Sequence, residues 1–199
     1  MKYMICDLET TVRNKIGTNK GSAHCKENKI VLFGTLIQGT IPQMLRTYGF
    51  VTQDHGIHSD WYTHNDLLVG HNLKFDLLYL LRGPEFRKTI WPKILVWDTA
   101  LAEYLLTGQD SRFPSLDGCS LKYGGTVKDK RISEMWDAGV QTEDMDNDML
   151  SEYLMHDLLN TELVFQHQFL TAKEAGMLPL IWSQMLALKA TTEKELNGM

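Results

Sequence analysis

The sequence predicts an α/β fold, a single domain built on a mixed β-sheet, from three observations. Apolar segments rich in β-branched and aromatic residues come first in the chain, at 2–7, 29–37 and 44–51. Short apolar segments at 66–70 and 94–97 then alternate with helical patterns, and helical patterns alone fill the remainder. The chain has 199 residues, 43% of them hydrophobic, which is enough for one full core.

The five apolar segments predict five strands. Gly39 and Pro42 mark the turn between the second and third strands. The three N-terminal strands are expected to be largely antiparallel, and helices are expected to flank the sheet. The predicted domain covers 1–175, and 176–199 forms a C-terminal helix that either packs on the domain or leads toward a polymerase body that this chain lacks.

The helical part begins after the fourth strand. A helix is predicted over 73–81, ended by the Gly-Pro pair at 83–84. Asp98 or Thr99 is expected to cap a helix over 100–106. Further helices are predicted at 115–123, 132–136, 149–175 and 180–196, with breaks at 124–125, 139 and 176–179.

Composition excludes several classes of protein. The three cysteines, Cys6, Cys25 and Cys119, include no Cys-x-x-Cys pair, which argues against a disulfide scaffold and structural zinc. Asp7 and Glu9 interrupt the only early apolar run, so no signal peptide is visible. No stretch approaches the roughly 20 apolar residues that span a membrane. We therefore expect a cytoplasmic protein (in the host cytoplasm if it comes from a phage) with no membrane partner.

The formal net charge of −5 seems unfavourable for binding nucleic acid, but its distribution is uneven. Basic residues gather in 13–29, 82–93 and 122–131, whereas 134–157 holds eight acidic residues and no Lys or Arg. Three basic segments around an acidic site are compatible with phosphate contacts. Each segment taken alone is equally typical of a solvated loop.

Four carboxylates lie among large apolar neighbours: Asp7, Glu9, Asp76 and Asp157. A buried carboxylate costs several kcal/mol unless it is paired or binds a metal. Because residues two apart on a strand share a face, Asp7 and Glu9 would lie about 6–7 Å apart, with Leu8 turned into the core. If the four converge, they suggest a site for two divalent cations and phosphodiester chemistry. The alternative is that the first strand stops early and both acids belong to a turn.

Two neighbouring polar residues strengthen this hypothesis. Asn72 follows a strand and is a good candidate for the N-cap of the next helix, which places Asp76 near the helix start where the dipole favours an anion. Tyr153 and Asp157 are four residues apart, on one face of a long helix. Next to them runs an apolar stripe expected to face the core: Leu150, Leu154, Leu158, Val164 and Phe165.

Three segments carry a resemblance to a known family. They are Cys-Asp-Leu-Glu-Thr at 6–10, Gly-His-Asn-Leu-Lys-Phe-Asp at 70–76 and Tyr-Leu-Met-His-Asp at 153–157. In order and spacing they resemble the three motifs of DEDD-type (DnaQ-like) 3′–5′ exonucleases. Tyr153, four residues before the last acid, is similar to the tyrosine subtype, as in the proofreading exonuclease domains of phage and bacterial family A DNA polymerases. The histidine subtype would need His at 152, which is Glu.

The resemblance implies a ribonuclease-H-like fold and two-metal hydrolysis of single-stranded DNA from its 3′ end, releasing nucleoside 5′-monophosphates. Asp7, Glu9 and Asp157 would hold the cation beside the attacking water, and Asp7 with Asp76 the cation beside the leaving oxygen. Oxygen ligands suit Mg²⁺ or Mn²⁺. Tyr153 would orient the water. Besides these catalytic residues, Thr10 and Asn72 resemble positions that contact or support the terminal nucleotide.

Several alternatives remain open. The protein could be a free-standing enzyme or a proofreading domain whose partner is a DNA polymerase, and its substrate could be RNA. It could also be a non-catalytic module with the same fold. Phe75, Trp97 and Tyr104 are equally good candidates for stacking on a base or for the core. A zinc site at His55-x-x-His58 has incomplete spacing.

Overall fold

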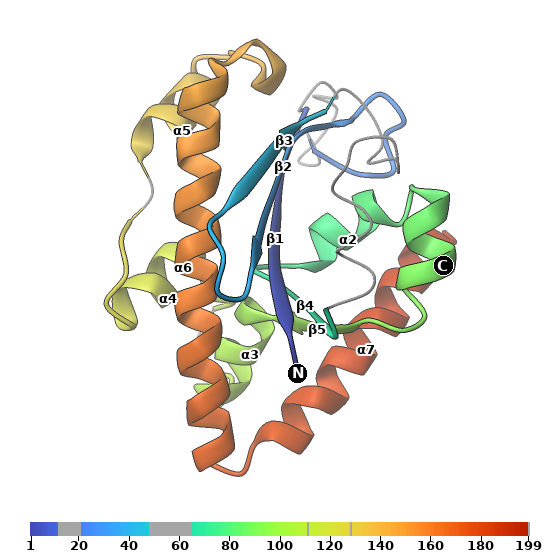
Figure 1. Cartoon of the computed structure of the whole chain (residues 1–199), viewed down its shortest axis with the longest axis vertical. Helices are drawn as coiled ribbons and strands as arrows, with labels where there is room; N and C mark the ends of the chain where they lie inside the picture. Colours follow the sequence, from blue (N-terminus) through green and yellow to red (C-terminus); the bar gives the residue numbers. More distant parts are fainter. Residues whose placement is uncertain (12–20, 48–64, 111, 128, 199) are drawn as a thin grey trace.

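The sheet forms the centre of the molecule (Figure 1). The computed structural model describes residues 1–11, 21–47, 65–110, 112–127 and 129–198. The strands are β1 (Tyr3–Thr10), β2 (Ile30–Ile37), β3 (Gln43–Arg46), β4 (Leu67–Gly70) and β5 (Leu95–Asp98). They are ordered β3-β2-β1-β4-β5. β1, β2 and β3 pair antiparallel, whereas β4 and β5 run parallel to β1. The predicted mixed five-stranded sheet is confirmed.

The helices cover both sides of this sheet. They are α2 (Lys74–Leu80), α3 (Thr99–Leu106), α4 (Leu116–Lys122), α5 (Lys130–Asp137), α6 (Asn147–Glu174) and α7 (Leu178–Leu196), with a π-helix at Phe86–Ile90 and a 3₁₀-helix at Thr142–Asp144. Figure 1 shows α6 along one side of the sheet, and α2 and α7 on the other. In the part of the chain that the structure describes, no helix is long and apolar enough to cross a bilayer.

The boundaries differ from the predicted ones in instructive ways. β1 continues to Thr10 because its pairing with β2 continues past the predicted end at residue 7. The expected third strand is observed as Gln43–Arg46, and its positions 48–51 lie outside the described residues. α7 begins at Leu178, inside the predicted break, because proline at residue 179 is tolerated in the first turn of a helix.

α6 packs closely on the sheet at a glycine. A Cβ atom at Gly34 of β2 would lie 2.8 Å from Leu154 Cδ2 and 3.0 Å from Leu158 Cδ1, so only glycine fits without moving the side chains of Leu154 and Leu158. The predicted core stripe of α6 is confirmed, since all five of its residues are buried: Leu150, Leu154, Leu158, Val164 and Phe165. This close contact fixes the distance between the long helix and the central strands.

α7 is held by specific contacts to the segment before β5. Lys189 Nζ donates to the carbonyl oxygens of Trp91 (2.7 Å) and Ile94 (2.8 Å) and lies 4.4 Å from the centre of the Trp91 ring. The Trp91 indole N–H donates to Glu193. Burial lowers the pKa of Lys189. The C-terminal helix therefore packs on the rest of the domain through polar as well as apolar contacts.

Candidate active site

Asp7 and Glu9 lie within β1, not in a turn after it. Asp7 pairs with Gly34 of β2, and Glu9 pairs with Leu32. Leu8, between them, is buried in the main core, as the alternation predicts. The register of the β1–β2 pair shifts between Glu9 and Thr10. Such β-bulges are common beside active sites, where they redirect side chains.

Both acids belong to the face of the sheet that α6 covers. Residues directly opposite each other on paired strands point to the same face. Gly34, opposite Asp7, lies against Leu154 and Leu158 of α6. Tyr3, on the same face as Asp7, contacts Phe165 of α6, with ring centres 4.9 Å apart.

α6 places the third predicted segment over these strands. Asp157 is 1% exposed and lies between Leu154 and Leu158, the two leucines that approach Gly34. Tyr153 is buried one turn earlier, in the same apolar cluster as Leu32, the partner of Glu9. Its ring meets Trp136 of α5 edge-on. The structure thus brings the first and third segments, which are far apart in the sequence, to one face of the sheet.

Asp76 reaches this region from α2. It lies in the first turn of the helix, as predicted, and is only 3% exposed. Burial raises the pKa of Asp76 well above its ordinary value, and the nearby Asp7 carboxylate raises it further. Glu9 and Asp98 add to the same effect. Among the described residues, Asp76 Oδ1 has no hydrogen-bond partner. It is thus a buried oxygen surrounded by other acids.

The prediction that Asn72 caps α2 is wrong. The N-cap position is Leu73, no side chain of the helix caps it, and Asn72 instead adopts a left-handed backbone conformation with φ 54°. The amide groups of Asn72 and Leu73 donate to the carboxylate of Asp98, each at 3.0 Å. A distant acid therefore fixes the backbone just before α2, where the sequence predicted a local cap.

Asp98 is the residue of the site region that sequence reasoning undervalued, since it was considered only as one of two possible helix caps. It ends β5 in register with Gly70, where β4 ends. A signal was available in the sequence. A carboxylate at the carboxyl end of a parallel strand lies at the edge where ligands bind in α/β sheets.

The two predicted nucleotide-contacting residues differ in exposure. Asn72 is exposed, at the start of the α2 turn. Thr10 is buried. Burial raises the pKa of Tyr79 while a hydrogen bond with Thr10 lowers it, so these two side chains are neighbours. Their roles toward a substrate stay predictions.

Of the three aromatic side chains that were candidates for stacking, Trp97 is fully buried and belongs to the core. Phe75 and Tyr104 are half-buried. Phe75 immediately precedes Asp76 and contacts the Tyr79 ring, with centres 5.3 Å apart. Phe75 therefore lies next to one of the predicted ligands, and stacking on a base stays a prediction.

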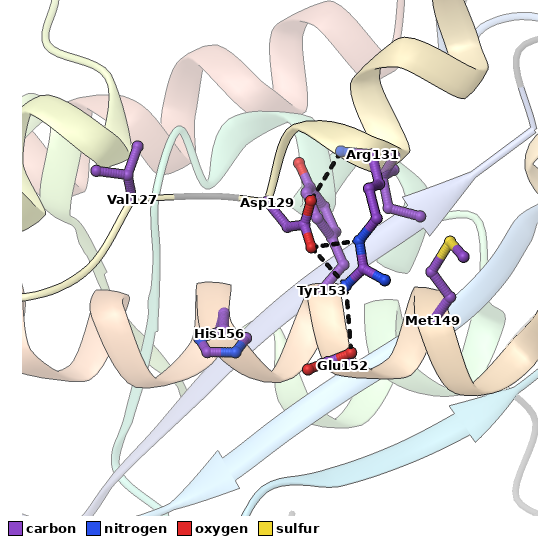
Figure 2. A pocket seen from close by; sticks show the side chains of 8 residues that line it. Val127, Asp129, Arg131, Met149, Glu152, Tyr153 and His156 are labelled. Carbon is purple, nitrogen blue, oxygen red and sulfur yellow. Dashed lines mark hydrogen bonds and ion pairs between the residues drawn. The ribbon is translucent and has the colours of Figure 1, made fainter.

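A pocket of about 220 Å³ opens beside Tyr153, between α5 and α6. Figure 2 shows the Arg131 guanidinium between Asp129 and Glu152, with Tyr153 and His156 rising from α6. Arg131 lies 2.5 Å from Asp129 and 3.7 Å from Glu152. Other basic residues of the sequence clusters are also engaged internally: Lys122 pairs with Glu103, and Arg82 donates to backbone carbonyls.

The donor set fits divalent cations in type. All four predicted ligands are carboxylates, three of them buried, and Asp76 keeps an oxygen available. Oxygen-only sets select hard cations such as Mg²⁺ or Mn²⁺. Within the described residues, no three His, Cys, Asp or Glu side chains are arranged to ligate one ion. His55 and His58, the residues of the zinc alternative, lie outside the described residues.

No protein-family model and no curated protein sequence matches the chain. Several solved structures are similar to the chain. Brucella melitensis NrnC bound to pGG matches with a TM-score of 0.70 and 14% identity over 98% of this chain and 85% of that one. NrnC with bound Mg²⁺ matches with a TM-score of 0.69 and 14% identity over 98% and 86% of the two chains. A structure described as the apo form of the nuclease gives a TM-score of 0.71, also at 14% identity, over 98% of this chain and 85% of that one.

A family B DNA polymerase from the archaeon Pyrobaculum calidifontis is also similar, with a TM-score of 0.57 and 14% identity over 96% of this chain but only 27% of the polymerase. At this identity the likeness concerns the fold. The chain therefore has the ribonuclease-H-like α/β fold shared with these nucleases.

Proposed function

We propose that the protein is a metal-dependent 3′–5′ exonuclease that removes nucleoside 5′-monophosphates from single-stranded DNA 3′ ends. One observation carries the proposal: Asp76 is buried with an available oxygen, and its pKa is raised by burial and by Asp7. Such an arrangement is costly for folding unless a cation occupies it. The fold it shares with solved nucleases supports the same reading.

The four acids and Tyr153 would have different roles in the reaction. Asp7, Glu9 and Asp157 would hold one divalent cation, and Asp7 with Asp76 a second. Bound cations would supply positive charge that acidifies a water molecule and stabilises the leaving 3′ oxygen. Tyr153, buried beside the partner of Glu9, would orient the attacking water through its hydroxyl. An ordinary phenol has a pKa of about 10 and is therefore protonated at neutral pH, so it does not serve as the base itself.

RNA trimming is a second candidate, favoured by the likeness to NrnC, which has been solved bound to pGG. The likeness to a DNA polymerase favours DNA and is compatible with either a free-standing enzyme or one that works with a polymerase. A protein that discriminates RNA must contact the 2′-hydroxyl. The two candidates therefore differ in one measurable property, the rate on matched DNA and RNA oligomers.

The test uses DNA and RNA oligomers of one sequence, labelled at the 5′ or the 3′ end, with and without Mg²⁺ or Mn²⁺. We expect a ladder of 5′-labelled products, immediate release of the 3′ label as a mononucleotide, and no reaction in EDTA. An intact oligomer that only shifts in a native gel would identify a binding module. Release of the 5′ label first would reverse the polarity.

Tyr153→Phe probes the role of the hydroxyl. We expect kcat to fall by about 10–100-fold, which is less than the roughly 10²–10⁴-fold of a general acid–base group, because the hydroxyl orients the water and takes no proton from it. Mn²⁺ binding measured by titration calorimetry should remain. If Mn²⁺ binding is lost as well, the tyrosine supports the cation site and does not orient water.

A further inference from the structure

Asp98 is a buried carboxylate with an unusual number of partners. It is 2% exposed at the end of β5. Its Oδ1 accepts from the amides of Ala100 (2.9 Å) and Leu101 (3.3 Å), which caps α3. These two bonds alone would make it an ordinary N-cap.

The same carboxylate also holds the start of α2. Oδ1 accepts from the Asn72 amide and Oδ2 from the Leu73 amide, each at 3.0 Å. α2 has no side-chain cap of its own. One buried carboxylate therefore accepts from two first-turn amides of α3 and from the two amides immediately before α2.

The residue after Asp98 adds to this anchoring. Thr99 Oγ1 donates to the Gly70 carbonyl (3.2 Å) and lies 2.9 Å from His71 Nδ1. The other ring nitrogen of His71 lies 3.2 Å from the Pro114 carbonyl. Asn72 is held in the left-handed region, which few residues other than glycine, asparagine and aspartate adopt.

We propose that Asp98 is a positioning residue for the active site: by fixing the turn before α2 it sets where the Asp76 carboxylate lies relative to Asp7. Asp76 is in the first turn of α2, three residues after Leu73, so a shift of the turn moves it directly. Asp98 itself contacts backbone amides and touches no substrate. Its kinetic consequence rests on the proposed exonuclease function, whereas its structural consequence does not.

Asp98→Ser separates positioning from capping. Serine is a good N-cap and can still serve α3, but its side chain is too short to reach the amides of Asn72 and Leu73. Asp146→Ser is the matched control, because Asp146 caps α6 through the amides of Asp148 and Met149 alone. Asp98→Asn is a second variant, which keeps Oδ1 on three amides and turns a donor toward Leu73.

Three measurements are compared across these proteins: kcat and KM on a labelled oligomer, affinity for Mn²⁺ alone, and amide hydrogen exchange over residues 70–77. For Asp98→Ser we expect kcat to fall at least about tenfold, with a smaller change in KM, because misplacement by about 1 Å can cost up to 100-fold. Mn²⁺ should bind more weakly and exchange over 70–77 should accelerate. Asp146→Ser should match the wild-type protein in all three.

Wild-type kcat, Mn²⁺ affinity and exchange in folded Asp98→Ser would overturn the inference and leave the exonuclease function intact. If the wild-type protein hydrolyses nothing, the proposed function fails, and exchange together with Mn²⁺ affinity still decides the role of Asp98. If both Asp98 variants fail to fold, exchange in the wild-type protein decides: an unprotected Leu73 amide would overturn the inference, and a protected one supports it.

Discussion

Two buried carboxylates, Glu103 in α3 and Asp76 in α2, are each only 3% exposed, yet their surroundings are opposite. Glu103 accepts hydrogen bonds from Lys122, from Tyr123 (2.9 Å) and from Gln168 (2.8 Å). Burial acts to raise the pKa of Glu103, but these donors outweigh it and leave the pKa below its ordinary value. Asp76 has other acids as neighbours, and its pKa is raised.

The surroundings of these two carboxylates distinguish a structural acid from a candidate ligand. A buried carboxylate with enough donors ties elements together, as Glu103 joins α3 to α4 and α6. A buried carboxylate that has an oxygen without a donor in the described part of the chain, and acids around it, weakens the fold. Its presence is best explained by a positively charged ligand. Four predictions test this contrast between Asp76 and Glu103.

The largest effect is expected for Asp76→Asn. Hydrolysis should fall at least about 1000-fold, which corresponds to about 4 kcal/mol of lost transition-state stabilisation. The melting temperature should stay the same or rise, because a desolvated charge next to Asp7 is removed. Single-turnover rates and thermal melting measure the two quantities. Residual activity above a tenth of the wild-type rate would show that Asp76 is no ligand.

Glu103→Gln is the matched change at the other acid. We expect a loss of about 2 kcal/mol in the free energy of unfolding, since hydrogen bonds to a charged group each contribute about 1.5–3 kcal/mol and Lys122 can turn to solvent. Activity per folded molecule should stay within about threefold of wild type. Urea unfolding gives the first value. A stable but inactive variant would contradict the purely structural role of Glu103.

Divalent cations should stabilise the protein through Asp76 and leave the Glu103 network unaffected. At ten times the dissociation constant, Mn²⁺ should add about 1.4 kcal/mol to the free energy of unfolding. The Glu103→Gln variant should gain as much, and Asp76→Asn should gain much less. Thermal shift in a Mn²⁺ titration measures this. Equal gains in both variants would place the cation elsewhere.

The smallest expected effects are two opposite dependences of the free energy of unfolding on pH, measured by urea unfolding in EDTA. The raised pKa of folded Asp76 means that its contribution to stability is greatest below its ordinary value of 3.8 and is lost as pH rises through the folded value. The lowered pKa of Glu103 means that its contribution is present above 4.5 and is lost as pH falls through the folded value.

Each substitution should therefore remove the pH dependence that its own residue contributes to the free energy of unfolding. Relative to Asp76→Asn, the wild-type protein should lose stability as the pH rises from about 4 to 7, since its folded state is the tighter proton binder. Relative to Glu103→Gln, it should gain stability as the pH rises from about 3 to 5. Slopes of the same sign in the two comparisons would refute the contrast.

Much of the fold could be predicted because its signals are local. The strand alternation of Asp7, Leu8 and Glu9 and the apolar stripe of α6 depend on periodicity, which the sequence shows directly. The antiparallel N-terminal strands and the helical second half followed from the same patterns. The structure places Asp76 near Asp7 and Glu9, whereas the convergence of all four acids on a pair of cations stays a prediction.

What could not be predicted depends on contacts between distant residues. Asn72 has the right chemistry for an N-cap, but the bonds from its own amide and that of Leu73 to Asp98 accompany a left-handed backbone at Asn72, whereas an N-cap residue is usually extended. The end of β1 is set by pairing with β2, which its own sequence does not reveal. The buried state of Trp97 likewise depends on its contacts with Phe165 of α6 and Trp182 of α7.

Gly34 of β2 lies where α6 packs on the sheet, opposite Asp7 of β1. Asp7 and Asp157 belong to layers that meet where this residue has no side chain. A methyl group at this position would require the side chains of Leu154 and Leu158 to move and would change how α6 packs on the strands. Substitution by alanine is therefore expected to shift Asp157 relative to Asp7 while both carboxylates remain in the sequence.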